Sequence, residues 1–359
     1  MTRAVLALVL VVPALALAAI GGAAPPGGTT QVIVTLEAPP LAQARGARSV
    51  AAARIVLEQR RFAWALAARF PDARIGWRYS LVANGMSVVL HTSHASRLGA
   101  LPGVRKVFPA VTYSASAGPD ATAIRARSFS ELPLERSGEG IKIGVIDDGL
   151  DQRHPFFEPS GYVMPPGYPK GQTAYTTAKV IVARAFPPPG TTWKNARLPF
   201  DPEESGHATH VAGIAAGNAG TAAQGGVRIS GIAPRAYLGN YKALTVPTDA
   251  GVGLDGNAPE LVAAIEAAVA DGMDVINLSL GEPEIDASRD VVALALDAAS
   301  DAGVVPVVAA GNDFDEFGAG SLSSPGSSAK AITVGAVSAD ASALAGFSAA
   351  GPTALSLRL

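Results

Sequence analysis

Short apolar runs and amphipathic stretches alternate along residues 31–113, and their order predicts a small α/β unit. The runs predicted as strands are Gln31–Leu36, Trp77–Leu81, Met86–Leu90 and Val104–Phe108, and the stretches predicted as helices are Ala51–Arg69 and Ser93–Ala100. This βαββαβ order is the ferredoxin-like motif. Asn84-Gly85 predicts a tight turn between the two middle strands, and Pro102-Gly103 predicts the end of the short helix. A compact unit therefore ends near Tyr113.

A second alternation begins at Ile141. Its apolar runs predict strands and its periodic stretches predict helices: strands Ile141–Ile146, Ala236–Leu244, Asp274–Leu278, Val304–Ala309 and Ala331–Ala336, and helices His207–Ala216, Pro259–Ala270 and Arg289–Ala302. Buried strands that alternate with helices predict an α/β fold with a doubly wound parallel sheet and helices on both faces. Asn257 as N-cap, with Glu260 three residues later and Gly272 beyond the end, predicts the limits of the middle helix.

Two segments outside these units have patterns of their own. Arg3 precedes the apolar run Ala4–Ile20 and then small residues, which is typical of a secretory signal peptide at residues 1–24. An uncleaved membrane anchor is the alternative, but the run is short for a membrane span and Pro13 interrupts it. Residues 114–138 are rich in Ala, Ser and Gly and predict a linker that is easily cut. The second unit then occupies residues 139–359.

Composition narrows the chemistry. Of the 359 residues 48% are hydrophobic and 16% are charged, which is enough apolar material for one large and one small unit. A formal net charge of −2 provides no basic footprint for nucleic acid. No cysteine is present, so there is no disulfide and no thiolate metal site, and any nucleophile must be an oxygen.

Candidate chemistry follows the predicted strands, because parallel sheets bind ligands at the carboxyl ends of their strands. Asp147 and Asp148 follow the first strand, Asn312 follows the fourth, and His207 and His210 open a helix. A carboxylate, a histidine and an amide donor on separate strand-end loops are three of the parts needed for acyl transfer. The two histidines lack the spacing and glutamate of a zinc helix, so a structural role is favoured for His210.

Four stretches, "IGVIDDG", "GHATHVAG", "NLSLG" and "VVAAGN", resemble the signature blocks of the subtilases in their chain order of acid and then histidine. The resemblance covers about residues 138–359, and residues 31–113, with "LPGVRKVFP" near their end, resemble the inhibitory propeptide of that family. It implies a secreted endopeptidase precursor that hydrolyses polypeptides through an Asp-His-Ser triad and an acyl-enzyme. Its expected partners are polypeptide substrates and its own propeptide, and its chemistry requires no cofactor.

Site residues are carried over from the resemblance at matching positions. Asp147 matches the acid that orients the imidazole, and His207 matches the general base. Asn312 matches the side-chain donor of the oxyanion hole. The residues that match the edge segment pairing with an extended peptide substrate are Ser279, Leu280 and Gly281.

Asp148 and two nearby glutamates raise the question of specificity. Asp148 directly follows the matched acid, while Glu203 and Glu204 lie just upstream of His207. Three carboxylates around one substrate subsite would favour a lysine or arginine there. The alternative is that all three are solvated loop acids. Ala208, where the family usually has glycine, adds a methyl group that could crowd the substrate cleft.

Two expected features of the family are not readable. The "GTSxAxP" block that carries the catalytic serine occurs nowhere in the sequence, and the candidate serines between Ser321 and Ser328 lie in a Gly- and Ser-rich stretch. Truncation before that block is expected, which would leave this fragment inactive; the alternative is a pseudoprotease that binds peptides without cleaving them. A structural calcium site is possible, although solvated loop acids are favoured, and the oxygen ligands on offer are Asp201, Glu203, Glu204, Asp313, Asp315 and Glu316.

Overall fold

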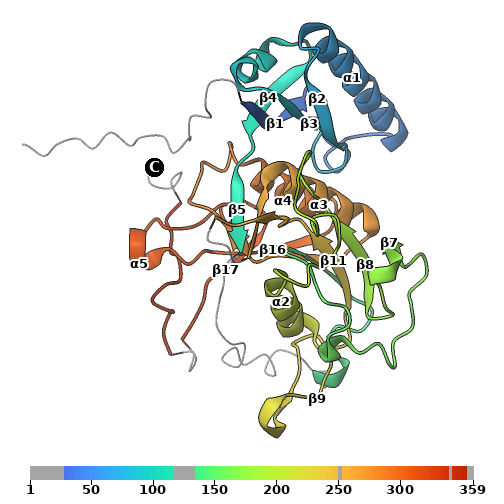
Figure 1. Ribbon diagram of the computed structural model, residues 1–359, viewed down its shortest axis with the longest axis vertical. Coiled ribbons are helices and arrows are strands. Elements are labelled where there is room, and N and C mark those ends of the chain that lie inside the picture. Colours follow the sequence, from blue (N-terminus) through green and yellow to red (C-terminus); the bar gives the residue numbers. More distant parts are fainter. Residues whose placement is uncertain (1–27, 116–133, 250–252, 339–341, 354–359) are drawn as a thin grey trace, which may run out of the picture.

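A computed structural model describes residues 28–115, 134–249, 253–338 and 342–353, which form a small N-terminal unit above a larger one (Figure 1). The predicted signal peptide and residues 116–133 of the predicted linker lie outside the described residues. Within the described part, no helix combines the length and apolarity that a membrane span requires.

The small unit has the predicted βαββαβ order, with a single 3₁₀ helix in the second helical position. Its elements are β1 (Thr29–Leu36), α1 (Arg48–Arg69), β2 (Arg74–Tyr79), β3 (Gly85–His91), η1 (Thr92–Ala100) and β4 (Val104–Pro109). The strands pair antiparallel in the order β2-β3-β1-β4. The tight turn predicted at Asn84-Gly85 is wrong, because residues 80–84 form a longer loop between β2 and β3. Asn84 is instead buried and donates to the carbonyl of Ala38 at 3.0 Å.

Alternation along β1 divides the small sheet into two faces. Val34 packs with Phe62 and Leu66 of α1, on the outer side of the unit. Ile33 and Phe108 point the other way and share a core with the larger unit. Period-two alternation thus gives one sheet an internal core and a docking face.

The larger unit is built on a fully parallel sheet. Its strands, in the order β17-β16-β14-β6-β11-β8-β7, are β17 (Ile332–Val334), β16 (Val305–Ala309), β14 (Val275–Leu278), β6 (Lys142–Asp147), β11 (Tyr237–Lys242), β8 (Val180–Ala185) and β7 (Lys170–Gly171). The predicted doubly wound fold and all five predicted strands are confirmed. Strand β8 was not predicted from the sequence, although it is longer than β14, β16 and β17.

Helices cover both faces of this sheet (Figure 1). Ile143 and Val145 of β6 pack with α2 (His207–Ala216), while Ile146 faces the core under α3 (Ala258–Asp271) and α4 (Val291–Asp301). Asn257 is the N-cap of α3, but its side chain makes no capping hydrogen bond. Gly272 ends that helix in the left-handed conformation, at φ 83°, as the sequence predicts.

A second, smaller sheet joins the two units. In it β5 (Thr112–Ala115) lies between β13 (Leu254–Asn257) and β15 (Leu280–Gly281), antiparallel to both, with β12 (Val246–Pro247) beyond β13. Strand β5 therefore continues two residues into the predicted linker. The remaining short elements are η4 (Leu134–Arg136), η5 (Pro155–Phe157), η6 (Thr173–Tyr175), β9 (Thr221–Ala222), η7 (Gln224–Gly226), β10 (Arg228–Ile229) and α5 (Phe314–Phe317).

Candidate active site

The predicted acid and base meet at the carboxyl edge of the parallel sheet. Asp147 is the last residue of β6 and is fully buried, and His207 is the first residue of α2. The Nδ1 atom of His207 lies 2.9 Å from both carboxylate oxygens of Asp147. Because a carboxylate only accepts, this contact assigns the proton to Nδ1 and leaves the lone pair of a neutral ring on Nε2. The arrangement is that of an oriented general base.

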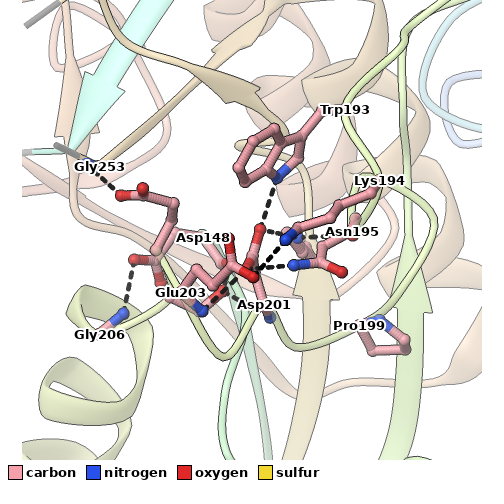
Figure 2. Close-up of polar contacts among 12 residues, drawn as sticks. Asp148, Trp193, Lys194, Asn195, Pro199, Asp201, Glu203, Gly206 and Gly253 are labelled. Carbon is pink, nitrogen blue, oxygen red and sulfur yellow. Dashed lines mark hydrogen bonds and ion pairs between the residues drawn. The ribbon is translucent and has the colours of Figure 1, made fainter. Parts of the chain in front are cut away.

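Asp148 holds the helix that carries the histidine. Its carboxylate accepts from the backbone N–H of Gly206 at 3.0 Å (Figure 2). It also accepts from the backbone N–H groups of His207 at 3.0 Å and of Ala208 at 2.7 Å. These are the unsatisfied donors of a helix N-terminus, and a negative charge is favourable there. Burial, with the charge of neighbouring Asp147, still raises the pKa of Asp148 to about 6. Asp148 thus couples the end of β6 to the start of α2.

This placement corrects the expectation that Asp148, Glu203 and Glu204 share a substrate subsite. Asp148 is 3% exposed and is turned toward the helix. Glu203 forms an ion pair with Lys194 at 2.5 Å, and Glu204 accepts from the backbone N–H of Gly253 at 2.9 Å (Figure 2). Each carboxylate has a separate partner, so the three do not form an acidic subsite.

Asp201, offered above as a calcium ligand, is a structural acid. It is fully buried and accepts from the Trp193 indole at 2.6 Å and the Asn195 amide at 2.8 Å, with the ammonium of Lys242 at 3.8 Å (Figure 2). Burial lowers the pKa of Lys242 to about 8. Across the described ranges, no group of three or more His, Cys, Asp or Glu is arranged to hold a metal ion.

The methyl group of Ala208 does not enter a cleft. It is 1% exposed and packs in the core beneath α2 with Ile143 and Val145, so the fold accommodates it and the cleft is not crowded. His210, three residues after His207, is exposed. Only His207 contacts Asp147, and it is the less exposed of the two histidines.

Asn312 follows β16, whose carboxyl end lies at the same sheet edge, with β14 between β16 and β6. Its side chain is partly buried. The preceding Gly311 has φ +106°, and a Cβ there would lie 1.7 Å from the hydroxyl oxygen of Ser323. Only glycine fits, which fixes the backbone that leads to Asn312.

The predicted substrate edge is occupied by the chain itself. Leu280 and Gly281 pair with Ala115 and Ser114 of β5. On the other side β13 pairs with β5, with Gly256 opposite Tyr113. Ser279 lies just before β15 and accepts from the Asn277 side chain at 2.9 Å, so it is not part of the pairing. An extended peptide is thus bound between two strands, and the sequence analysis identified only one of them.

Two glutamates of α3, which the sequence analysis did not assign to docking, hold the small unit. The carboxylate of Glu266 accepts from the backbone N–H groups of residues 80–82 at 2.6–2.7 Å. Glu260 is fully buried and accepts from the Trp77 indole at 3.0 Å and from Gln31 at 3.2 Å. Burial raises the pKa of Glu260 to about 7. In sequence these acids look like ordinary helix residues, because their partners lie more than 180 positions away.

Comparison with known proteins agrees with this architecture. Subtilisin-like protease SBT2.1 of Arabidopsis thaliana is 34% identical over 267 residues, covering 66% of this chain and 31% of the relative. Minor extracellular protease Vpr of Bacillus subtilis is 31% identical over 280 residues, covering 74% of this chain and 31% of the relative. The chain therefore spans about a third of the length of these curated relatives.

Two solved structures share the fold. The epidermin leader peptide processing serine protease of Staphylococcus aureus has a TM-score of 0.57 at 15% identity, covering 90% of this chain and 72% of that one. Fervidolysin of Fervidobacterium pennivorans has a TM-score of 0.54 at 20% identity, covering 90% of this chain and 45% of that one. Residues 138–358 match the model of the subtilase family. This match extends over more than half of the sequence, and the chain belongs to the subtilase family.

Proposed function

We propose that this chain provides the acid and base of a serine endopeptidase that hydrolyses polypeptides through an acyl-enzyme. The observation that carries the proposal is the contact of His207 Nδ1 with both oxygens of Asp147. In the proposed reaction Nε2 takes the proton of the attacking serine, and Asp147 stabilises the imidazolium that forms. Asn312 donates to the oxyanion. The 359 residues contain no "GTSxAxP" block. The proposal therefore concerns a protein in which such a block provides the attacking serine.

The test uses the full-length protein that includes a serine block. His207→Ala and Asp147→Asn are each expected to lower kcat by about 10⁴-fold or more on a peptide substrate. His207→Ala removes the base that accepts the serine proton, and Asp147→Asn no longer holds the imidazole in the tautomer that can accept it. His210→Ala is the matched control, since that exposed histidine lies on the same helix. Hydrolysis within tenfold of wild type in His207→Ala would overturn the assignment.

We also propose that residues 31–113 form an inhibitory propeptide, released by cutting within 114–138. The binding of β5 between β13 and β15 supports this, because it occupies the edge that a substrate strand would need. A fragment of residues 28–115, added to the mature enzyme, is expected to inhibit at micromolar concentration. A fragment of residues 28–111, which lacks β5, is the control and is expected to inhibit far less. Equal inhibition by both would contradict the role of β5.

Export and the non-catalytic alternative have their own tests. The apolar run at residues 4–20, together with a relative named as an extracellular protease, supports export with a processed N-terminus at Pro25, which N-terminal sequencing of the secreted protein would check.

The rival function is a pseudoprotease, favoured by one observation: an extended strand is bound here without any chemistry. A natural coding sequence that stops after Leu359, with peptide binding but no labelling by a fluorophosphonate, would favour it.

A further inference from the structure

Tyr113, in the middle of β5, occupies a site with an unusual lining. Its side chain is 1% exposed and belongs to the apolar core that includes Leu254 and Leu280 of the flanking strands. Its hydroxyl donates to Oδ1 of Asp290 at 3.1 Å and also contacts the carboxylate of Glu282. The aromatic ring of Tyr113 thus lies in an apolar core, while its hydroxyl lies beside two carboxyl groups. We call Tyr113, Glu282 and Asp290 the Tyr113 site.

The two acids come from elements that also hold the bound strand. Glu282 directly follows β15, and Asp290 is the N-cap of α4, accepting from the backbone N–H groups of Val292 and Ala293 at 2.8 and 3.1 Å. Asp290 is fully buried. Capping of α4 explains why Oδ1 of Asp290 is buried. It does not explain the burial of Asp290 Oδ2 or of the Glu282 carboxylate.

These carboxylates are costly to bury. Within the described residues, Oε1 of Glu282 and Oδ2 of Asp290 are buried without a hydrogen-bond partner. Burial, with the charge of Asp290, raises the pKa of Glu282 to about 8, and burial raises the pKa of Asp290. A fold that needed only an apolar cavity would place no acid there. The phenol hydroxyl of Tyr113, which donates to Asp290, compensates part of this cost.

We propose that the Tyr113 site is a specificity subsite that selects tyrosine over phenylalanine in the extended peptide bound along β5, at the position opposite Gly256. The inference rests on the proposed peptidase function, and Tyr113 is the chain's own occupant of the site. Phenylalanine fills the same volume but offers no hydroxyl to the two acids, so Asp290 keeps only its backbone donors, Val292 and Ala293. Sites built to bind a hydroxyl discriminate strongly against the analogue that lacks it, so a preference of at least about tenfold is expected.

A first experiment needs no catalysis. In the full chain, Tyr113→Ala leaves the space of the phenol ring unfilled, and thermal unfolding is measured with p-cresol or with toluene. p-Cresol is expected to raise Tm more than toluene does, and the addition of Glu282→Leu, which leaves Asp290 as the remaining acceptor, is expected to reduce that difference. Equal shifts with both ligands would overturn the proposal. Where Tyr113→Ala does not fold, Tyr113→Phe is compared with wild type: a lower Tm supports the site, and an unchanged Tm overturns it.

A second experiment uses the active full-length enzyme on peptides that differ only by Tyr, Phe or Leu at this position. The expected result is kcat/KM at least about tenfold higher for Tyr than for Phe, with a smaller ratio in Glu282→Leu, where Asp290 is the remaining acceptor. Parity in wild type would overturn the subsite while leaving the peptidase function intact. Cleavage of none of the peptides would speak against the proposed function, and the p-cresol comparison would then decide the site by itself.

Discussion

Asp148 decides, at the scale of a single residue, how the histidine is presented. Its side chain binds three backbone N–H groups at the start of α2, and its own backbone N–H donates to Asp147 at 2.7 Å. It is thus a positioning residue, which acts on His207 through the helix backbone rather than through substrate. A carboxylate that sequence alone places beside the substrate is, in the structure, part of the helix N-terminus.

Removal of this carboxylate is expected to destabilise the fold. Asp148→Ala leaves three donors without their acceptor and should lower the free energy of unfolding by about 2 kcal/mol, whereas Asp148→Asn, which keeps one acceptor oxygen, should cost less. Urea unfolding of the chain measures this. Glu203→Ala is the matched control, since its ion pair with Lys194 is exposed and is expected to contribute little to stability. If the urea unfolding curve of Asp148→Ala superimposes on that of Glu203→Ala, the Asp148 carboxylate does not contribute to the free energy of unfolding.

At the scale of elements, α3 is the surface on which the small unit docks. Glu260 and Glu266 both accept hydrogen bonds from the small unit, and the phenol of Tyr79 donates to the carbonyl of Pro259 at 3.0 Å. The docking contacts are thus polar groups set within an apolar face. Such contacts fix orientation, because every misplaced register leaves a buried acid unsatisfied.

The raised pKa of Glu260 makes this docking pH-dependent. Its pKa is 4.5 when exposed and about 7 when docked, so the docked state binds the proton more tightly. The contribution of Glu260 to stability is therefore fully present below about pH 4.5 and is lost as the pH rises through 7. Denaturant unfolding at pH 5, 6, 7 and 8 should show a shallower decline in Glu260→Gln than in wild type. A decline of equal slope in both proteins would mean that Glu260 does not titrate in this range.

The elements that could be predicted from sequence are those whose pattern is local. Helix α2 agrees with prediction at both ends, because its apolar repeat is confined to ten residues. The segment that became β5 has no such pattern: Thr112–Ala115 is a strand because β13 and β15 lie on either side of it. The hydrogen-bond partners of Asp148 and Glu266 also lie far away in the sequence. The sequence shows that these residues are acids, but it does not show which groups they contact. The contact between Asp147 and His207 could be predicted because strand ends and chain order constrain both residues.

For the whole molecule, the two units share one continuous core, and this predicts that they remain together when the chain is cut. Ile33, Tyr79 and Phe108 of the small unit pack in the same cluster as residues of α3 and α4. With a protease site inserted within 116–133, the cut chain should elute from size exclusion as one complex. Glu266→Ala, which removes four hydrogen bonds at the interface, should shift part of the cut sample to separate peaks. Complete separation of the cut wild-type protein would contradict the shared core.

The position of β5 also has a consequence for kinetics. A strand joined covalently to its own binding groove meets that groove at an effective concentration set by chain length and not by the amount of protein in solution. In the uncut chain β5 therefore returns to β13 and β15 after every opening, however dilute the sample. After a cut, return becomes a bimolecular encounter and slows in proportion to dilution. After a cut, the fraction of grooves that β5 occupies would therefore be smallest where the protein is most dilute.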